Sequence, residues 1–164
     1  MCFRFLLVAV MLTANPVQAQ EDFVGRITHV SDGDTLWVQA DAGGAPRKLR
    51  LDGIDAPEIC QIGGAAAREA LARQVLHKPV RVTVRRDDSY GRALARIEIA
   101  GSDVGAQMVR SGQAWSYRWR RDLGPYAAEE ALARHSGLGL FASSQPELPR
   151  DFRKRHGPCQ AARQ

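Results

Sequence analysis

Residues 50–58 read Arg50-Leu51-Asp52-Gly53-Ile54-Asp55-Ala56-Pro57-Glu58, and the rest of the chain is organised around them. This stretch holds one guanidinium and three carboxylates. Because an unpaired buried charge costs several kcal/mol or changes its protonation, a cluster of this density needs a cation or water beside it. Its proline cannot donate to a β ladder, so a strand that enters this stretch should end there.

A second acidic segment, Asp32-Gly33-Asp34-Thr35, lies between two predicted strands at residues 23–30 and 34–39. Asp-Gly between apolar strands is a strong signal for a hairpin turn. Asp34 alternates in phase with Leu36, so its carboxylate should lie on the face that enters the core. A carboxylate there requires a cation, whereas a tight turn alone explains the first two residues of the segment.

The remaining pattern predicts an α+β fold. Alternation indicates strands at residues 47–54, 80–85 and 92–99, and helical spacing indicates helices at residues 65–76, 104–111 and 126–136. The first of these helices has a core stripe of Ala67, Leu71 and Val75. Five short strands with one helix between the third and the fourth is the element order of an OB-type barrel. We therefore predict an OB-fold-like five-stranded β-barrel with three helices.

The first 19 residues are predicted to be a signal peptide. Arg4 provides a short positive region, and the apolar run at residues 5–12 is too short to anchor the chain in a bilayer. Val17-Gln18-Ala19 has the small-residue form of a cleavage site, so the mature chain should begin at Gln20. The expected location is secreted or periplasmic, with no membrane attachment after cleavage near Ala19.

Length and charge limit the class of protein. The 164 residues suffice for one domain, predicted at residues 20–143, and an extended basic tail is predicted at residues 144–164. The net charge of +5 suits a polyanionic partner, although from the charge alone an ordinary solvated surface is the favoured explanation. The four histidines are widely spaced and no Cys/His group has the spacing of a zinc site, which disfavours zinc.

Two cysteines, Cys60 and Cys159, remain once the signal peptide with Cys2 is removed. Persistent free thiols are uncommon in an oxidising compartment, so we predict a Cys60–Cys159 disulfide that pins the tail beside residues 50–58. Alternatively, Cys60 is a small buried residue and Cys159 is a free thiol, because sequence alone gives no distance between the two α-carbons.

Three short motifs occur in order along the chain: Asp32-Gly33-Asp34-Thr35, Arg50 with Ile54-Asp55-Ala56-Pro57-Glu58, and Tyr90-Gly91-Arg92. Taken together, these motifs resemble the staphylococcal nuclease family. Weaker matches at residues 109–112, 114–115 and 137–141 extend the resemblance over about residues 22–142. A single short motif arises easily by chance, but three in register are specific.

The resemblance implies a Ca²⁺ site formed by Asp34, Asp55 and the backbone carbonyl of Ala56. Carboxylate and carbonyl oxygens are ligands that this hard cation accepts. Asp32 matches a position next to the metal, and Asp32 and Thr35 are expected to support the metal ligands or to contact substrate. Many relatives have Thr where this chain has Ala56, so the side-chain hydroxyl is lost and the carbonyl is kept.

The resemblance also assigns catalytic residues. Glu58 corresponds to the general base, or to the residue that orients the attacking water, and Arg50 and Arg92 correspond to two arginines that grip the scissile phosphate. Guanidinium suits this role because its planar fork donates paired hydrogen bonds and keeps its charge. Tyr90 resembles a tyrosine beside a neighbouring phosphate, although packing on the barrel explains it equally well. Ser89 stands where some relatives have Lys, which removes one phosphate contact.

The function implied is that of an exported, monomeric, Ca²⁺-dependent endonuclease that hydrolyses DNA and RNA with little sugar specificity and leaves 3′-phosphate ends. The alternative is a non-catalytic nuclease-like OB module that binds nucleic acid or protein. Degenerate modules of this kind lose metal carboxylates or arginines, whereas both kinds of residue are present here. The enzyme is therefore the favoured hypothesis.

Two further groups of residues have open roles. Trp115, Tyr117 and Trp119 either stack on bases or pack in the core. In the basic tail, substitution of Arg153 or Lys154 is expected mainly to weaken substrate affinity, in a manner that depends on salt.

Overall fold

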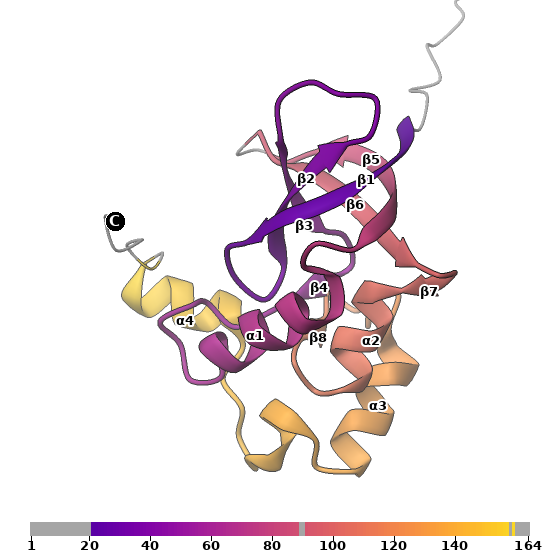
Figure 1. The fold of residues 1–164 in the computed structure, drawn as a ribbon. Coiled ribbons are helices and arrows are strands. Elements are labelled where there is room, and N and C mark those ends of the chain that lie inside the picture. The colour runs from indigo at the N-terminus through magenta and orange to yellow at the C-terminus, as the bar shows by residue number, and fades with distance from the viewer. Residues whose placement is uncertain (1–20, 89–90, 158, 160–164) are drawn as a thin grey trace, which may run out of the picture.

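The computed structural model describes residues 21–88, 91–157 and 159, and its largest element is a closed β-barrel (Figure 1). A parallel pairing of β3 with β6, in which Leu49 lies opposite Ala93, closes the barrel. The other neighbours pair antiparallel in the order β3-β2-β1-β5-β6. This confirms the predicted five-stranded OB-fold-like barrel. Its strands are β1 (Glu21–Val30), β2 (Thr35–Ala40), β3 (Arg47–Leu51), β5 (Pro79–Asp87) and β6 (Ala93–Ile99).

Aliphatic side chains fill the barrel and the space under its helices. Ile27, Leu36, Leu49, Val82 and Ile97 come from the five barrel strands, and each is fully buried. Burial of one such side chain stabilises the folded state by roughly 1.5–3 kcal/mol. The barrel interior is therefore a packed core, and polar groups that do chemistry have to lie at its rim.

Three helices lie together beyond one end of the barrel (Figure 1). They are α1 (Gly64–Val75), α2 (Val104–Arg110) and α3 (Ala127–His135), close to the predicted bounds. As predicted, the α1 stripe of Ala67, Leu71 and Val75 is buried. The short strand β7 (Ser102–Asp103) leads into α2, and a 3₁₀ helix, η1 (Gly139–Ala142), follows α3.

The third strand is shorter than predicted. β3 ends before a turn at Asp52-Gly53, and the next strand, β4 (Ile54–Asp55), pairs with β8 (Trp115–Ser116) instead of with the barrel. Gly53 has a φ of +80°, and a Cβ at this position would lie 2.6 Å from Pro125. Only glycine adopts such a backbone without strain, so this turn needs Gly53. The turn sends β4 away from the barrel.

The tail predicted as extended contains a helix, α4 (Pro149–His156), so the described part of the chain has four α-helices where three were expected. The prediction was wrong because it gave more weight to low apolar content than to the signals at the helix ends. Pro149 is in the first turn, where its missing N–H is not needed, and Asp151 lies near the positive end of the helix dipole. Gly157 follows the helix with a φ of +71°. None of the helices within the described ranges is long and apolar enough to cross a membrane.

A buried acidic residue holds β8 in place. Glu130 of α3 is 1% exposed, and its carboxylate accepts hydrogen bonds from Ser116 N at 3.0 Å and from Arg134 Nε at 2.7 Å. Arg118 is its third partner. Removal of one member of such a buried pair is costly, because it leaves a charge without its counter-charge. The network fixes β8 against α3, and the pairing of β8 with β4 then fixes Asp55.

Candidate active site

Two acidic residues from different segments meet at one arginine. Asp34, immediately before β2, is 3% exposed, and Asp55 in β4 is 7% exposed. Arg50 of β3 donates from Nη1 to Asp34 Oδ1 at 2.6 Å and from Nη2 to Asp55 Oδ1 at 3.0 Å. The structure thus brings three of the predicted site residues into direct contact, with the guanidinium of Arg50 on the carboxylates.

Neighbouring groups orient the Asp34 carboxylate. Thr35 Oγ1 donates to Asp34 Oδ1 at 3.0 Å, and the backbone N–H of Ala56 donates to Asp34 Oδ2 at 3.1 Å. Asp32 Oδ1 accepts from the backbone N–H of Asp34 at 3.0 Å, which is the hydrogen bond of an Asx turn. Asp32 therefore shapes the hairpin turn, while Thr35 and Ala56 fix the direction of Asp34.

A second arginine in this centre comes from α4. Arg153 Nη1 donates to Glu58 Oε1 at 2.8 Å and to Asp55 Oδ1 at 3.3 Å, and its Nη2 donates to Asp55 Oδ2 at 3.3 Å. The sequence does not predict this position of Arg153, because the basic tail indicates only a contribution to substrate affinity. The predicted disulfide was the available signal, since it brings Cys159 beside the loop that follows Glu58.

The crowding of carboxylates changes their acidities. Burial raises the pKa of Asp32 to about 7, and the nearby Asp34 carboxylate adds to this rise. Burial also raises the pKa of Asp55, although the charges of Arg50 and Arg153 oppose the rise. Burial alone would lower the pKa of Arg50, but Asp34 and Asp55 hold it above its ordinary value. These shifts are those expected where negative charges crowd in a partly dehydrated site.

The balance of charge in this centre fits a divalent cation. Ca²⁺ accepts carboxylates, carbonyls and water in loose geometry. No group of three or more His, Cys, Asp or Glu side chains in the described ranges is arranged to hold a metal ion, so Asp34 and Asp55 would need the Ala56 carbonyl and water to complete a site. The described part of the centre has four carboxylates and two guanidinium groups, those of Asp32, Asp34, Asp55 and Glu58, and of Arg50 and Arg153.

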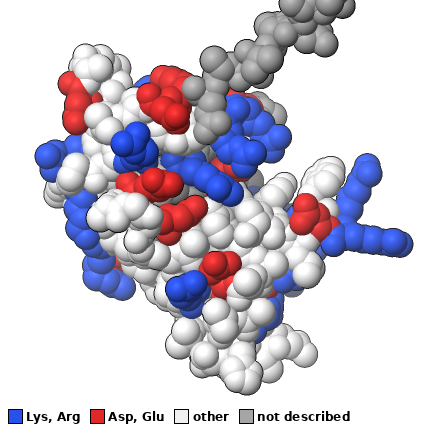
Figure 2. Space-filling view, turned by 90° about the vertical axis from the view of Figure 1, so that its right-hand side faces the viewer, with Lys and Arg blue, Asp and Glu red and all other residues white. Residues whose placement is uncertain are grey.

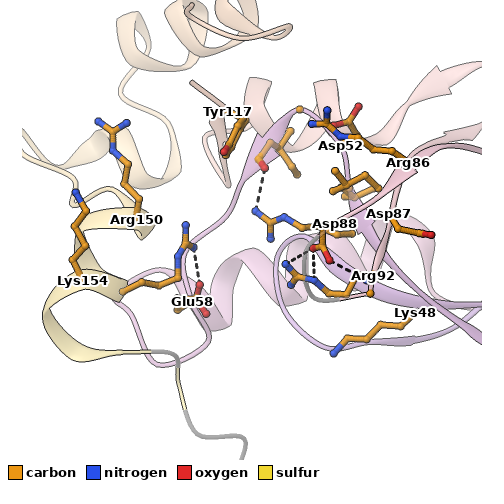
Figure 3. A pocket seen from close by; sticks show the side chains of 17 residues that line it. Lys48, Asp52, Glu58, Arg86, Asp87, Asp88, Arg92, Tyr117, Arg150 and Lys154 are labelled. Atoms are coloured by element: carbon orange, nitrogen blue, oxygen red, sulfur yellow. Dashed lines mark hydrogen bonds and ion pairs between the residues drawn. The ribbon is translucent and has the colours of Figure 1, made fainter. Parts of the chain in front are cut away.

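Arg50, Glu58 and Arg153 line a cavity of about 1220 Å³. Arg92, just before β6, lines the same cavity, and its Nε donates to Asp88 Oδ2 at 2.8 Å. Figure 3 shows Arg150 and Lys154 on one side of the cavity and Lys48 and Arg92 on the other. Tyr90, the remaining predicted substrate residue, lies outside the described residues. The charged residues described in the lining are Lys48, Arg50, Arg86, Arg92, Arg150, Arg153 and Lys154, and Asp52, Glu58, Asp87 and Asp88.

The charge in the cavity differs from that of the face in Figure 2. That face is the right-hand side of Figure 1, which carries β7 and α3, and its acidic and basic side chains lie next to one another among neutral residues. The described lining of the cavity has seven basic and four acidic side chains, and a hollow with such an excess of Lys and Arg focuses positive potential. The cavity is therefore the better place for a polyanionic ligand.

The structure contains the Cys60–Cys159 disulfide, with the two α-carbons 5.8 Å apart. Gln61 provides a second tie between the same segments. Its Nε2 donates to Glu147 O at 2.7 Å, and its Oε1 accepts from Glu58 N at 3.2 Å. The tail is therefore fixed against the loop that carries Glu58.

The three aromatic residues with open roles have different surroundings. Trp115 is buried and packs edge-on against Phe141, with ring centroids 5.9 Å apart. Tyr117 lines the large cavity. Trp119 is 64% exposed and, with Tyr117, lines a smaller pocket of about 210 Å³ beside α4. Trp115 thus packs in the core, whereas Tyr117 and Trp119 are accessible to a ligand.

Known proteins resemble this chain over most of its length. A family model described as staphylococcal nuclease homologue matches residues 48–143. The chain is 31% identical over 153 residues to a Haemophilus influenzae protein named uncharacterized endonuclease, with 92% of this chain and 85% of the relative covered. It is 34% identical over 163 residues to a micrococcal nuclease of Shigella flexneri, with 92% and 91% covered. It is also 35% identical over 157 residues to protein ParB of Escherichia coli, with 89% and 86% covered.

The family match and the geometry of the site coincide. The matched residues include Arg50, Asp55, Glu58 and Arg92, which line the cavity or contact one another around it. Asp34 precedes the match, but Arg50 joins it directly to Asp55. The chain therefore belongs to the staphylococcal nuclease family.

Proposed function

We propose that this chain is a Ca²⁺-dependent endonuclease that hydrolyses phosphodiester bonds of DNA and RNA with little sugar specificity. Its family membership makes it a nuclease. The observation that carries the finer proposal is the contact of Arg50 with Asp34 and Asp55 at the wall of a cavity that also holds Glu58. The basic side chains of that cavity suit the phosphates of either nucleic acid.

The side chains of the cavity can divide the reaction between them. Glu58 accepts a proton from the attacking water while the water oxygen forms a bond to phosphorus. The bond between phosphorus and the 5′-oxygen breaks, this oxygen takes up a proton from solvent, and the phosphate stays on the 3′-end of the other fragment. Arg50 and Arg92 donate hydrogen bonds to the phosphoryl oxygens, where negative charge increases in the transition state.

Asp34, Asp55 and the carbonyl oxygen of Ala56 would hold the Ca²⁺, which when bound supplies positive charge beside the scissile phosphate. Cleavage of plasmid DNA and of RNA is therefore expected with Ca²⁺, weak with Mg²⁺ and absent in a chelator of divalent cations. Mg²⁺ is the weaker activator because it demands stricter octahedral geometry and loses water reluctantly. Gel electrophoresis of the products measures each case.

The control for the metal experiment is recovery of cleavage when Ca²⁺ is added back to the chelated sample. Full cleavage by protein verified to be free of metal would contradict the Ca²⁺ requirement. If the protein binds nucleic acid but does not cleave it with Ca²⁺, with Mg²⁺ or in chelator, the result would instead favour the non-catalytic OB module.

The proposal includes export of a monomeric mature chain. The Cys60–Cys159 disulfide supports this part, because structural disulfides persist in oxidising compartments. N-terminal sequencing of protein recovered from the periplasm or the culture medium is expected to begin at Gln20. A mature protein that begins at Met1 would contradict cleavage near Ala19.

A further inference from the structure

Helix α4 lies beyond residue 143, where the family match ends, yet its side chains line the cavity. The start of the helix is held by the buried Pro149 and by Leu148, which packs against the cluster of Trp115. The residues after the helix are held by the disulfide between Cys60 and Cys159. The helix is therefore fixed at both ends.

Three side chains of α4 line the cavity, and they are not equivalent. Arg150, Arg153 and Lys154 share one helical face, since their spacing is i, i+3 and i+4. The Arg153 side chain is 34% exposed, and the Arg150 side chain is 54% exposed. Arg153 reaches two of the four carboxylates of the centre, at 2.8 Å from Glu58 and 3.3 Å from Asp55. In the described part of the chain, Arg153 is the cation that forms an ion pair with Glu58.

We propose that Arg153 is a positioning residue of the nuclease, which holds the Glu58 carboxylate beside Asp55 in the direction that receives a proton from the attacking water. The inference rests on the proposed function, because it assigns Glu58 to proton transfer. A carboxylate on a loop samples several rotamers, and a guanidinium that bonds it and its neighbour at once restricts that freedom. Orientation of this kind is a large part of what active sites contribute to rate.

An alternative role for Arg153 is inhibition, in which its contacts with Glu58 and Asp55 block the site until Arg153 moves away, as a lock would. A lock has to leave before substrate reacts, but the disulfide and the Gln61–Glu147 hydrogen bond keep α4 against the loop of Glu58. The anchored helix keeps the backbone of Arg153 beside Glu58, and in the proposed role the side-chain contact persists during the reaction. Lys154 is exposed at the cavity, so a substrate phosphate is its expected partner.

The experiment compares Arg153→Ala, Arg153→Lys and Lys154→Ala in the full mature chain with the disulfide intact. Steady-state cleavage of a single-stranded DNA oligonucleotide in Ca²⁺ gives kcat and KM, and thermal unfolding shows that each variant is folded. Arg153→Ala is expected to lower kcat on the order of 10²-fold with little change in KM, the cost of a slightly misplaced catalytic group. Arg153→Lys should recover part of kcat, because lysine keeps the positive charge. Recovery should be incomplete, because lysine lacks the planar guanidinium that bonds two carboxylates at once.

Lys154→Ala should have the opposite effect to Arg153→Ala, because it should raise KM and leave kcat unchanged. It should also reduce the salt dependence of substrate binding by about one phosphate contact. The matched control is Arg68→Ala on α1, which removes the same charge from an exposed position that does not line the cavity. It should leave kcat and KM unchanged. A merely structural role of Arg153 would lower the unfolding temperature without this division between kcat and KM.

Parental kcat in Arg153→Ala overturns the inference, and so does a raised kcat, which would identify a lock. If Arg153→Ala does not fold, Arg153→Gln, which keeps a hydrogen-bonding side chain without the charge, decides in its place. Failure of the parent to cleave with Ca²⁺ overturns the proposed function and the inference together. Cleavage by the parent that is unaffected by Arg153 substitution overturns the inference alone.

Discussion

Replacement of Glu58 by Gln is expected to lower kcat by roughly 10²- to 10⁴-fold, the usual contribution of a general base. Glutamine keeps the length of the side chain and an acceptor oxygen that Arg153 can still bond, but its neutral amide does not take up the proton of the attacking water. Substrate binding should remain nearly intact. Single-turnover cleavage gives the chemical rate, and fluorescence anisotropy with an oligonucleotide in chelator gives the affinity.

The matched control for this substitution is Glu69→Gln on α1, whose side chain is 63% exposed and pairs with Arg73 on the helix surface. It makes the same chemical change outside the cavity and should leave kcat as in the parent. A Glu58→Gln variant as active as the parent would show that another group accepts the proton. Loss of affinity with unchanged kcat would make Glu58 a binding residue.

Among the substitutions proposed for this chain, replacement of both Cys60 and Cys159 by Ser is expected to lower the free energy of unfolding most. The bond joins residues 99 positions apart, and a loop of about this length contributes up to about 4.7 kcal/mol in the chain-entropy description. The free energy of unfolding, measured by urea titration of parent and variant, gives the difference. Because the bond holds α4, kcat should fall in the same direction as in Arg153→Ala.

Reduction provides the control for the disulfide experiment. A thiol reductant should lower the stability of the parent toward that of the double Ser variant and should leave the variant unchanged. Thiol titration of the folded, oxidised parent should find no reactive group at Cys60 or Cys159. Two reactive thiols in that sample would contradict the bond.

The barrel could be predicted from sequence because its signals are local. Alternation marked the strands, Asp32-Gly33 marked the hairpin, and the stripe of Ala67, Leu71 and Val75 marked the buried face of α1. The third strand was predicted to run to residue 54, because the apolar residues Leu51 and Ile54 lie on both sides of the turn that ends β3. The positive φ of Gly53 makes the turn, and the need for it comes from distant packing on Pro125.

The site could be predicted only in part, because its contacts join segments that are far apart in the chain. The motif supplied Asp34, Asp55 and Glu58, but it did not indicate that Arg50 would bond both aspartates. The position of Arg153 depends on α4, whose end signals were overlooked. It also depends on contacts between residues that are 95 and 98 positions apart in the sequence, and no short sequence pattern encodes such contacts.

If the chain is exported as proposed, the long span of the disulfide would also order the events of biosynthesis. In a chain that crosses a membrane from its N-terminus, Cys60 emerges first and waits until 99 further residues have followed before Cys159 can reach it. The barrel strands β5 and β6 lie between the two cysteines, so the barrel can close while the first thiol is still free. On this route, attachment of α4 would be the closing step, and the catalytic centre would be assembled after the scaffold that carries it.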